Sequence, residues 1–295
     1  MMNTPDFHPA KGDGAPATAQ TRRYARVLSI AGSDSGGGAG IQADLKTFAA
    51  LGCYGMTAIT AITAQNTLGV TAIHALPPEL LKAQIDAVVS DIGVDAVKIG
   101  MLHAPEIVRV VAQAIRNHSL KQIVFDPVMV ATSGDRLIAE ETVQVLKDEL
   151  FPYVSLITPN LDEAELLLGR KISGVADLDA AAAELLDLGA PAVLLKGGHL
   201  AERGGGNEVV DVLFTADTRL RLASERIQSH NVHGTGCTLS SAIAAHLALG
   251  HALPQAVQLA RAYILQAIAS GADVSTGQGH GPLNHGFAPV AMVKF

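Results

Sequence analysis

The chain has 295 residues and is 48% hydrophobic, a length that suits one large α/β domain as well as two smaller ones. Its net charge of −7, its charged fraction of 17% and the lack of a basic run argue against a nucleic-acid partner. The two cysteines, Cys53 and Cys237, exclude a disulfide framework and suit a reducing cytoplasm.

The N-terminal stretch is rich in Pro, Ala, Gly, Thr and charged residues. We expect residues 1–25 to form a disordered tail, because this composition buries little apolar surface. The stretch has no apolar core of signal-peptide length, and longer apolar runs elsewhere are interrupted by Gly, Thr or charge. Neither an export signal nor a membrane span is therefore expected. Residues 26–295 carry no repeat or linker, which favours a single domain.

The first ordered unit reads as strand, glycine-rich loop and helix. Residues 27–31 form an apolar run, residues 32–40 hold the glycines, and a helical pattern follows until Gly52. The loop matches neither the dinucleotide fingerprint nor the phosphate-binding loop, but it lets a ligand approach the backbone closely. Asp44, early in the helix, is either a ligand contact or a solvated helix charge.

The next segment alternates Thr with apolar or small residues over 56–63, which predicts a strand with one polar face. Residues 65–69 resemble a turn, and residues 70–73 a returning strand. We expect this hairpin-like pair to stand off the main sheet as a lid.

The remaining chain alternates strands and helices, which predicts a parallel sheet covered on both faces. The expected strands are 96–100, 122–125, 155–157 and 192–195, followed by antiparallel edge strands at 208–214 and 218–223. The expected helices are 79–92, 105–117, 140–149, 161–168, 178–188, 238–249 and 254–269.

A second glycine turn, residues 231–239, organises the chain chemically. Gly234, Thr235 and Gly236 allow several backbone N–H groups to point one way just before a helix, and such a terminus binds anions. The helix dipole is expected to lower the pKa of Cys237, which would make this thiol a base. The alternative is a glycine-tolerant loop in which Cys237 is a small core residue.

Polar residues gather where the predicted parallel strands end, the edge at which such sheets bind ligands. The set comprises Ser33, Asp34, Asp126, Asn160, Glu163 and Lys196. Carboxylates beside an anion site suggest Mg²⁺ carried with phosphates, and hence phosphoryl transfer. Each residue also has a structural alternative, since Asn160 and Glu163 fit a capping box and Asp126 could cap its strand.

A series of motifs carries a specific resemblance. They lie, in order, at residues 31–46, 63–67, 98–101, 126–129, 158–164, 196–199 and 233–238. Together they resemble the bacterial hydroxymethylpyrimidine/phosphomethylpyrimidine kinases of thiamine synthesis, members of the ribokinase-like superfamily. The resemblance spans about residues 26–282 and leaves the N-terminal tail outside.

The resemblance implies a three-layer α/β/α sandwich with a mainly parallel central sheet and a small β flap. It implies a catalytic turn at Cys237, with Gly234, Thr235 and Gly236 around it. The pyrimidine is expected near Gly32, Asp44, Gln65 and Met101. ATP is expected over Lys196, Asp126 and Asn160, with Mg²⁺ near Asp126 and Glu163.

The implied activity is ATP-dependent phosphorylation of hydroxymethylpyrimidine and then of its monophosphate. A pyridoxal kinase of the same fold is the alternative. A sugar kinase is disfavoured, because Cys237 stands where those enzymes carry an Asp base. A non-catalytic vitamin sensor is disfavoured by the retained Lys196 and Glu163. The expected partners are small molecules only, without nucleic acid or membrane, and the family implies a homodimer.

Overall fold

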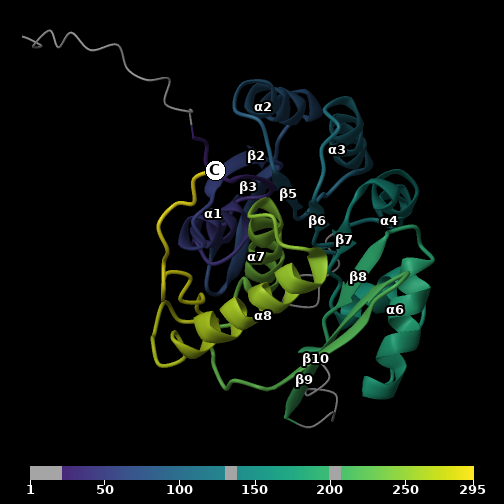
Figure 1. Ribbon diagram of the computed structural model, residues 1–295, viewed down its shortest axis with the longest axis vertical. Coiled ribbons are helices and arrows are strands. Elements are labelled where there is room, and N and C mark those ends of the chain that lie inside the picture. The colour runs from purple at the N-terminus through teal and green to yellow at the C-terminus, as the bar shows by residue number, and fades with distance from the viewer. Residues whose placement is uncertain (1–21, 130–137, 199–206) are drawn as a thin grey trace, which may run out of the picture.

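The computed structural model describes residues 22–129, 138–198 and 207–295 (Figure 1). Most of the predicted tail, residues 1–21, lies outside the described residues. The described chain is already anchored before residue 26, because Tyr24 pairs with Lys294 and Ala25 is fully buried. Arg23 and Phe295 exchange backbone hydrogen bonds, which brings the start and end of the described chain together.

An eight-stranded sheet forms the centre, with the strand order β10-β9-β8-β7-β6-β5-β1-β2. Its neighbours run parallel from β2 to β8, while β9 and β10 form the predicted antiparallel edge. The strands are β1 (Arg26–Ala31), β2 (Tyr54–Ile59), β5 (Ala96–Ile99), β6 (Ile123–Phe125), β7 (Leu156–Ile157), β8 (Ala192–Leu195), β9 (Glu208–Thr215) and β10 (Arg219–Glu225).

The sheet reverses its winding between β1 and β5. The chain moves from β1 to β2 on one side, and then returns to place β5 on the other side of β1. In open α/β sheets, such a switch point leaves a crevice beyond the carboxyl ends of the two strands. Gly32 follows β1 there, and Met101 follows β5.

A separate two-stranded hairpin, β3 (Ala61–Asn66) and β4 (Gly69–Ala75), forms the predicted flap. The expectation of one continuous strand over 56–63 is wrong, because β2 ends at Ile59 and β3 begins at Ala61. Thr60 makes the break: its N–H donates to Ala31, and its hydroxyl donates to the Met101 carbonyl at 3.2 Å. The chain therefore leaves the central sheet at this buried residue.

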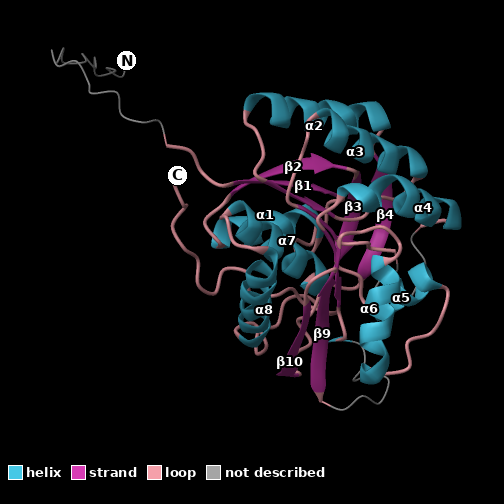
Figure 2. Ribbon diagram, turned by 45° about the vertical axis from the view of Figure 1, so that its right-hand side comes forward, coloured by secondary structure: helices cyan, strands magenta, loops and turns pink. Residues whose placement is uncertain are grey.

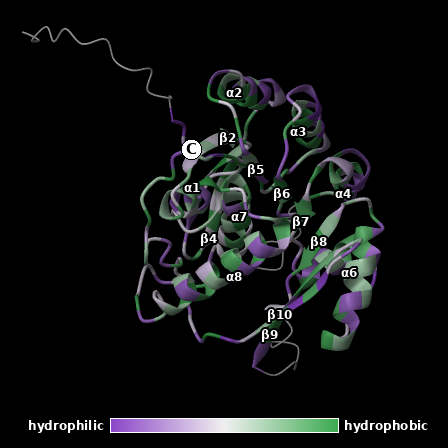
Figure 3. Cartoon of the chain, in the orientation of Figure 1, coloured by the Kyte–Doolittle hydropathy of each residue, from purple (hydrophilic) through white to green (hydrophobic). Residues whose placement is uncertain are grey.

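Helices cover both faces of the sheet, which confirms the three-layer α/β/α sandwich (Figure 2). One layer holds α2 (Pro78–Asp91), α3 (Pro105–Asn117), α4 (Glu140–Val145), α5 (Leu161–Leu168) and α6 (Leu178–Leu186). The other holds α1 (Gly40–Ala50), α7 (Thr235–Ala248) and α8 (Leu253–Ala269). Successive strand residues alternate between the two cores, as Leu28 and Val27 do. Helix α6 is mostly apolar and buries Leu178, Ala181, Ala182 and Leu185, while Asp179 and Glu184 are its two charged residues, as expected of a helix with one buried side (Figure 3).

Two helix boundaries differ from the sequence expectation in ways that matter. The segment expected as one helix over 140–149 is α-helical only to Val145 and continues as a π-helix over Leu146–Leu150. Helix α7 begins at Thr235, not at 238, because Gly234 adopts a left-handed conformation and serves as its N-cap. Gly236 and Cys237 are thus part of the first helical turn. In the part of the chain that is described, no helix combines the length and apolar character needed to cross a membrane.

Candidate active site

The glycine-rich loop after β1 is shaped by Asp34. This carboxylate is buried and accepts hydrogen bonds from the N–H groups of Gly36, Gly38 and Ala39 at 2.8–3.0 Å. His233 Nε2 lies 2.9 Å from Asp34 Oδ2. Burial alone would raise the pKa of Asp34, but the hydrogen bonds from His233 and the loop outweigh it and hold the pKa below its ordinary value. Asp34 thereby ties the first glycine loop to the second.

The second glycine turn packs directly on the first. Gly234 has φ +84°, and a Cβ built there would lie 1.8 Å from the Gly38 carbonyl oxygen. A Cβ on Gly38 would in turn meet the His233 ring at 2.5 Å. Only glycine fits at Gly234, because the backbones of the two loops touch there, whereas a side chain at Gly38 would displace the His233 ring.

The first turn of α7 presents free backbone donors. The Thr235 N–H donates to Val232, and the Thr238 N–H donates to Gly234. The N–H groups of Gly236 and Cys237 donate to no acceptor among the described residues. Unpaired N–H groups at a helix N-terminus attract anions, so the predicted anion site has the required backbone geometry.

Lys196 and Asp126 lie against this turn. A Cβ built on Gly236 would be 3.3 Å from both Lys196 Nζ and Asp126 Oδ2. Lys196 Nζ donates to Asp126 Oδ1 at 2.8 Å, and the Thr158 hydroxyl donates to the same oxygen at 2.8 Å. Burial would raise the pKa of Asp126, but Lys196 and Lys98 overcome it and lower the pKa. The structure thus brings the predicted nucleotide residues to the predicted anion site.

Glu163 and Asn160 form the capping box at the start of α5. The Asn160 N–H donates to Glu163 Oε2 at 2.7 Å, and the Glu163 N–H donates to Asn160 Oδ1 at 2.9 Å. Glu163 is also buried near Asp126 and Lys196. Burial raises the pKa of Glu163 to about 7 despite the opposing attraction of Lys196.

The donor set fits a Mg²⁺ ion that arrives with a nucleotide. Among the described residues, no group of three or more His, Cys, Asp or Glu is placed to hold a metal by itself. From the residues that the structure describes, Asp126 Oδ2 receives only a long contact, 3.4 Å, from the Ser240 hydroxyl. Mg²⁺ commonly binds one or two carboxylates together with phosphate oxygens, and Asp126 and Glu163 supply that number.

Cys237 differs from the sequence expectation. A lowered pKa was expected from the helix dipole, but burial raises the pKa of this thiol above its ordinary value. Lys98 and the Gly40 N–H act in the opposite direction without overcoming burial. The expectation is wrong because it considered only α7 and not the buried surroundings of its first turn.

Asp44, which is expected at the ring edge of a ligand, has all its contacts inside the protein. It is fully buried, and its two oxygens accept hydrogen bonds from Ser29, Ser241 and Lys98. These bonds occupy the lone-pair positions of the carboxylate. In this structure Asp44 is therefore the partner of an internal ion pair, and its expected contact with the substrate ring stays a prediction.

The other three predicted substrate residues surround the switch point. A Cβ on Gly32 would lie 3.6 Å from the Met101 terminal methyl group. Gln65 projects from the flap, with its Nε2 3.4 Å from His233 Nε2 and its Oε1 3.4 Å from the Thr63 hydroxyl. Both contacts are long for hydrogen bonds, so the amide of Gln65 retains capacity for a ligand.

The flap is attached to the first glycine loop. Thr63 donates two hydrogen bonds of 2.9 Å to Ser33, from its N–H to the Ser33 hydroxyl and from its hydroxyl to the Ser33 carbonyl. The Ser35 hydroxyl donates to the Gln65 carbonyl and accepts from the Gln65 N–H. Sequence reasoning did not single out His233 or Lys98 as organisers of the site. No local pattern marks either residue, because each acts on a partner far away in the sequence.

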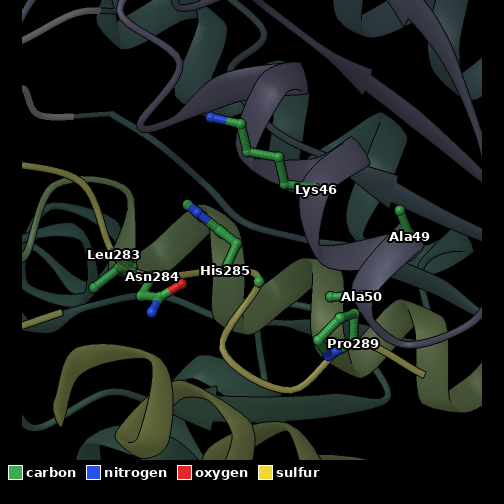
Figure 4. Close-up of a pocket in the computed structure, with 8 residues that line it drawn as sticks. Lys46, Ala49, Ala50, Leu283, Asn284, His285 and Pro289 are labelled. Carbon is green, nitrogen blue, oxygen red and sulfur yellow. The ribbon is translucent and has the colours of Figure 1, made fainter. Parts of the chain in front are cut away.

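Two cavities flank the site without containing its predicted residues. One has a volume of about 430 Å³ and lies between α1 and the C-terminal segment (Figure 4). Lys46 lines it and also donates to the Gly37 carbonyl at 2.7 Å. The other, of about 550 Å³, is lined by Asn231 and the loop after α8. The chemistry of the site is therefore assigned from the converging polar groups and not from the cavities.

Comparison with known proteins agrees with these features. The family model described as phosphomethylpyrimidine kinase matches residues 34–284. The chain is 53% identical over 260 residues to the hydroxymethylpyrimidine/phosphomethylpyrimidine kinase of Rhizobium meliloti, a match covering 88% of this chain and 96% of the relative. The phosphomethylpyrimidine kinase structure from Clostridium difficile is 46% identical with a TM-score of 0.73, over 82% of this chain and 99% of that one.

A pyridoxal kinase is also similar in structure. The Bacillus subtilis enzyme, solved as an ADP complex, is 38% identical with a TM-score of 0.81, over 89% of this chain and 98% of that one. The backbone therefore does not separate the two kinds of kinase, although the sequence identity is higher with the phosphomethylpyrimidine kinase.

Proposed function

We propose that this chain, which belongs to the phosphomethylpyrimidine kinase family, transfers phosphate from ATP to 4-amino-5-hydroxymethyl-2-methylpyrimidine and then to its monophosphate, in thiamine biosynthesis. The family model and the curated relatives confirm the resemblance predicted from the motifs. One observation supports the proposal most: Lys196 and Asp126 lie against the helical turn that carries the unpaired N–H groups of Gly236 and Cys237, beside the switch point. The proposal treats residues 26–295 as one catalytic domain, because both helix layers pack on the same sheet.

The pyrimidine is proposed to lie between Gly32, Met101 and the flap. Gly32 leaves room beside the ring, and Met101 offers an apolar contact. Gln65 carries both a donor and an acceptor, which suits the aminopyrimidine edge. The hydroxymethyl group would then point toward the first turn of α7.

The nucleotide is proposed to lie over Lys196, Asp126 and Asn160, with its terminal phosphate at the Gly234–Cys237 turn. The structures of relatives with ADP support a nucleotide site in this fold. The free N–H groups and Lys196 would stabilise charge on the moving phosphoryl group. Asp126 and Glu163 would hold Mg²⁺, which would neutralise charge on the phosphates when bound. Thr235 belongs to the same turn, and its hydroxyl donates to the Val232 carbonyl at 2.7 Å.

Cys237 is proposed as the base for the first step. The hydroxyl of the substrate must lose a proton as its oxygen attacks, and a thiolate at Cys237 would accept that proton. In the second step the acceptor is a phosphate that is already anionic, so this base is not needed.

Turnover assays with separate acceptors test the proposal. ATP consumption is measured with hydroxymethylpyrimidine, with its monophosphate and with pyridoxal. We expect both pyrimidine acceptors to be phosphorylated, with the diphosphate as the final product. Exclusive turnover of pyridoxal would instead support the second candidate, a pyridoxal kinase. The observation in favour of that candidate is the TM-score of 0.81 with a pyridoxal kinase structure.

The chain is also proposed to act as a cytoplasmic homodimer. The free thiols Cys53 and Cys237 suit a reducing compartment. The hairpin of β3 and β4 exposes apolar side chains, and an isolated two-stranded hairpin is only marginally stable in water. A second copy that covers this hairpin would stabilise it.

A further inference from the structure

A fully buried ion pair lies beneath the proposed transfer site, between the central sheet and the helix layer that holds α1 and α7. Lys98 on β5 and Asp44 on α1 are both 0% exposed, and Lys98 Nζ donates to the two Asp44 oxygens at 2.9 and 3.0 Å. The Ser29 hydroxyl on β1 and the Ser241 hydroxyl on α7 donate to the same carboxylate at 2.5 and 2.6 Å. The pair therefore joins two strands of the switch point to two helices.

Helix geometry places this pair one turn below Cys237. Cys237 and Ser241 are four residues apart on α7, so they share one face of that helix. Gly40 and Asp44 have the same spacing on α1, and the Gly40 N–H forms a hydrogen bond to the Cys237 sulfur. The thiol and the ion pair are thus adjacent along the line where α1 meets α7.

The charges around the thiol come from four elements. They are Lys98 on β5, Asp44 on α1, Asp126 after β6 and Lys196 after β8. Among these groups, Lys98 has the largest effect on the thiol and favours its thiolate. Burial would lower the pKa of Lys98, but attraction to Asp44 and Cys237 overcomes it, so the ammonium stays charged.

We propose that Lys98 is a positioning residue for the first phosphorylation: clamped by Asp44, its ammonium is a fixed positive charge that stabilises the thiolate of Cys237 against the burial that opposes it. The thiolate takes the hydroxyl proton of the substrate. A bond forms between the substrate oxygen and the terminal phosphorus of ATP, and the bond from that phosphorus to the bridging oxygen breaks to release ADP. This inference rests on the proposed role of Cys237 as the base.

The test measures alkylation of Cys237 by iodoacetamide against pH, because this reaction reports the thiolate directly. Mass spectrometry of the Cys237 peptide separates it from Cys53, whose pKa burial raises to about 12. Lys98→Met removes the cation, and Asp44→Asn removes the anion at nearly constant size but keeps one acceptor oxygen in place of two, so it can still accept from Ser29 or from Ser241. We expect the alkylation midpoint to rise by about one pH unit or more in Lys98→Met and to fall in Asp44→Asn.

Opposite shifts are the signature of charge, because a structural defect common to both variants would not move the midpoint in two directions. Shifts of the same sign, or none, in folded variants would overturn the proposal. If Lys98→Met alone fails to fold, the double variant Lys98→Met/Asp44→Asn leaves neither charge unpaired. Its midpoint must still exceed that of the wild type, since Lys98 affects the thiol more than Asp44 does.

Arg26→Met provides the matched control. Arg26 pairs with Asp95 near the opposite end of β1 and β5, so its loss lowers stability without changing charge near Cys237. Its alkylation midpoint should equal that of the wild type. Single-turnover rates complete the test. Lys98→Met should slow phosphorylation of the alcohol by a factor at least about tenfold larger than its effect on phosphorylation of the monophosphate. If the alkylation midpoint of Lys98→Met shifts but both phosphorylation steps slow equally, Lys98 still acts on the thiol by charge. Cys237 is then not the base, and the positioning role of Lys98 is rejected.

Discussion

Cys237 illustrates how a single side chain is defined by its surroundings. The free N–H groups of its helical turn would serve both phosphorylation steps, whereas its sulfur can assist only an acceptor that must lose a proton. Burial raises the pKa of the thiol, so the thiolate depends on the positive groups nearby. The two steps therefore make different demands on this residue.

Cys237→Ala should slow phosphorylation of the alcohol by about 10²–10⁴-fold, the usual contribution of a positioned base, with a much smaller effect on the monophosphate. Single-turnover kinetics with each acceptor measures this. Cys53→Ala is the control, because that thiol is buried against the Ala245 carbonyl near the C-terminal end of α7, away from the first turn, and its loss should affect neither step selectively. Equal losses in both steps would assign Cys237 to the shape of the turn.

Glu163 should make stability depend on pH in a defined direction. Its pKa rises from an ordinary 4.5 to about 7 in the folded protein, so the folded state holds this proton more tightly than the unfolded state. The associated stability is fully present below pH 4.5 and is lost as the pH rises through 7.

Glu163→Gln removes this titration and keeps a capping-box side chain. The unfolding free energy of the wild type, relative to the variant, should therefore fall between pH 4.5 and 7, by at most about 1.4 kcal/mol per pH unit. Urea unfolding at several pH values measures it. A difference that stays constant with pH would show that the folded Glu163 has an ordinary pKa.

At the scale of elements, the contact between the two glycine loops decides the geometry of the site. Gly234 begins α7 in a left-handed conformation, against the Gly38 carbonyl. Asp34 and His233 fasten the same contact through hydrogen bonds. A side chain at Gly234 must separate the loops, and with them the anion site and the substrate crevice.

Gly234→Ala should lower the unfolding free energy by more than the roughly 1–2 kcal/mol that left-handed backbone costs an L-residue, and it should slow both phosphorylation steps. Gly250→Ala is the matched control. Gly250 has φ +90° but nothing within 4 Å of its built Cβ, so it carries only the conformational cost. Chemical denaturation of the two variants gives the difference, and equal losses would mean that the loops tolerate separation.

Local sequence patterns predicted most helices and strands, but they did not predict that the strand expected over 56–63 is broken in two. The helix at Pro105–Asn117 and the capping box at Asn160 follow from neighbouring residues, and the structure confirms both. The break at Thr60 depends on hydrogen bonds to Ala31 and Met101, which are distant in sequence. A period-2 pattern continues through such a break, because both strands that flank it have the same period.

At the scale of the whole molecule, the sheet order explains why part of the site was predicted. The carboxyl ends of parallel strands meet at one edge, so Asp126 and Lys196 could be placed together from their positions after strands. The same reasoning could not find the partner of Asp44. Lys98 lies within β5 and reaches Asp44 across the interior, and no local pattern reports which buried charges meet.

The surface of the hairpin argues for assembly of two chains. Ile62, Leu68, Val70 and Ile73 are 43–68% exposed on a hairpin that forms no part of the main sheet. Thr63 and Gln65, which face the site, belong to the same hairpin. They are the cross-strand partners of Ile73 and Val70, and paired residues lie side by side on one face of the hairpin. A partner that covers these apolar residues would therefore also hold the flap over the substrate.

Ile73→Lys should convert a dimer of 30.5 kDa chains to monomers at concentrations where the wild type is dimeric, and it should raise the KM for the pyrimidine. The charge would be placed at the proposed contact, where burying it without a partner is unfavourable. Sedimentation velocity over a concentration series measures the mass. Val274→Lys is the control, because Val274 is 54% exposed and Ile73 55%, but Val274 lies in the loop after α8. A wild-type mass of one chain at every concentration would contradict the dimer. Equal dissociation of both variants would mean that the hairpin is not the specific contact between the two chains. Dissociation of Ile73→Lys alone, with weaker pyrimidine binding, would link the flap to the second copy.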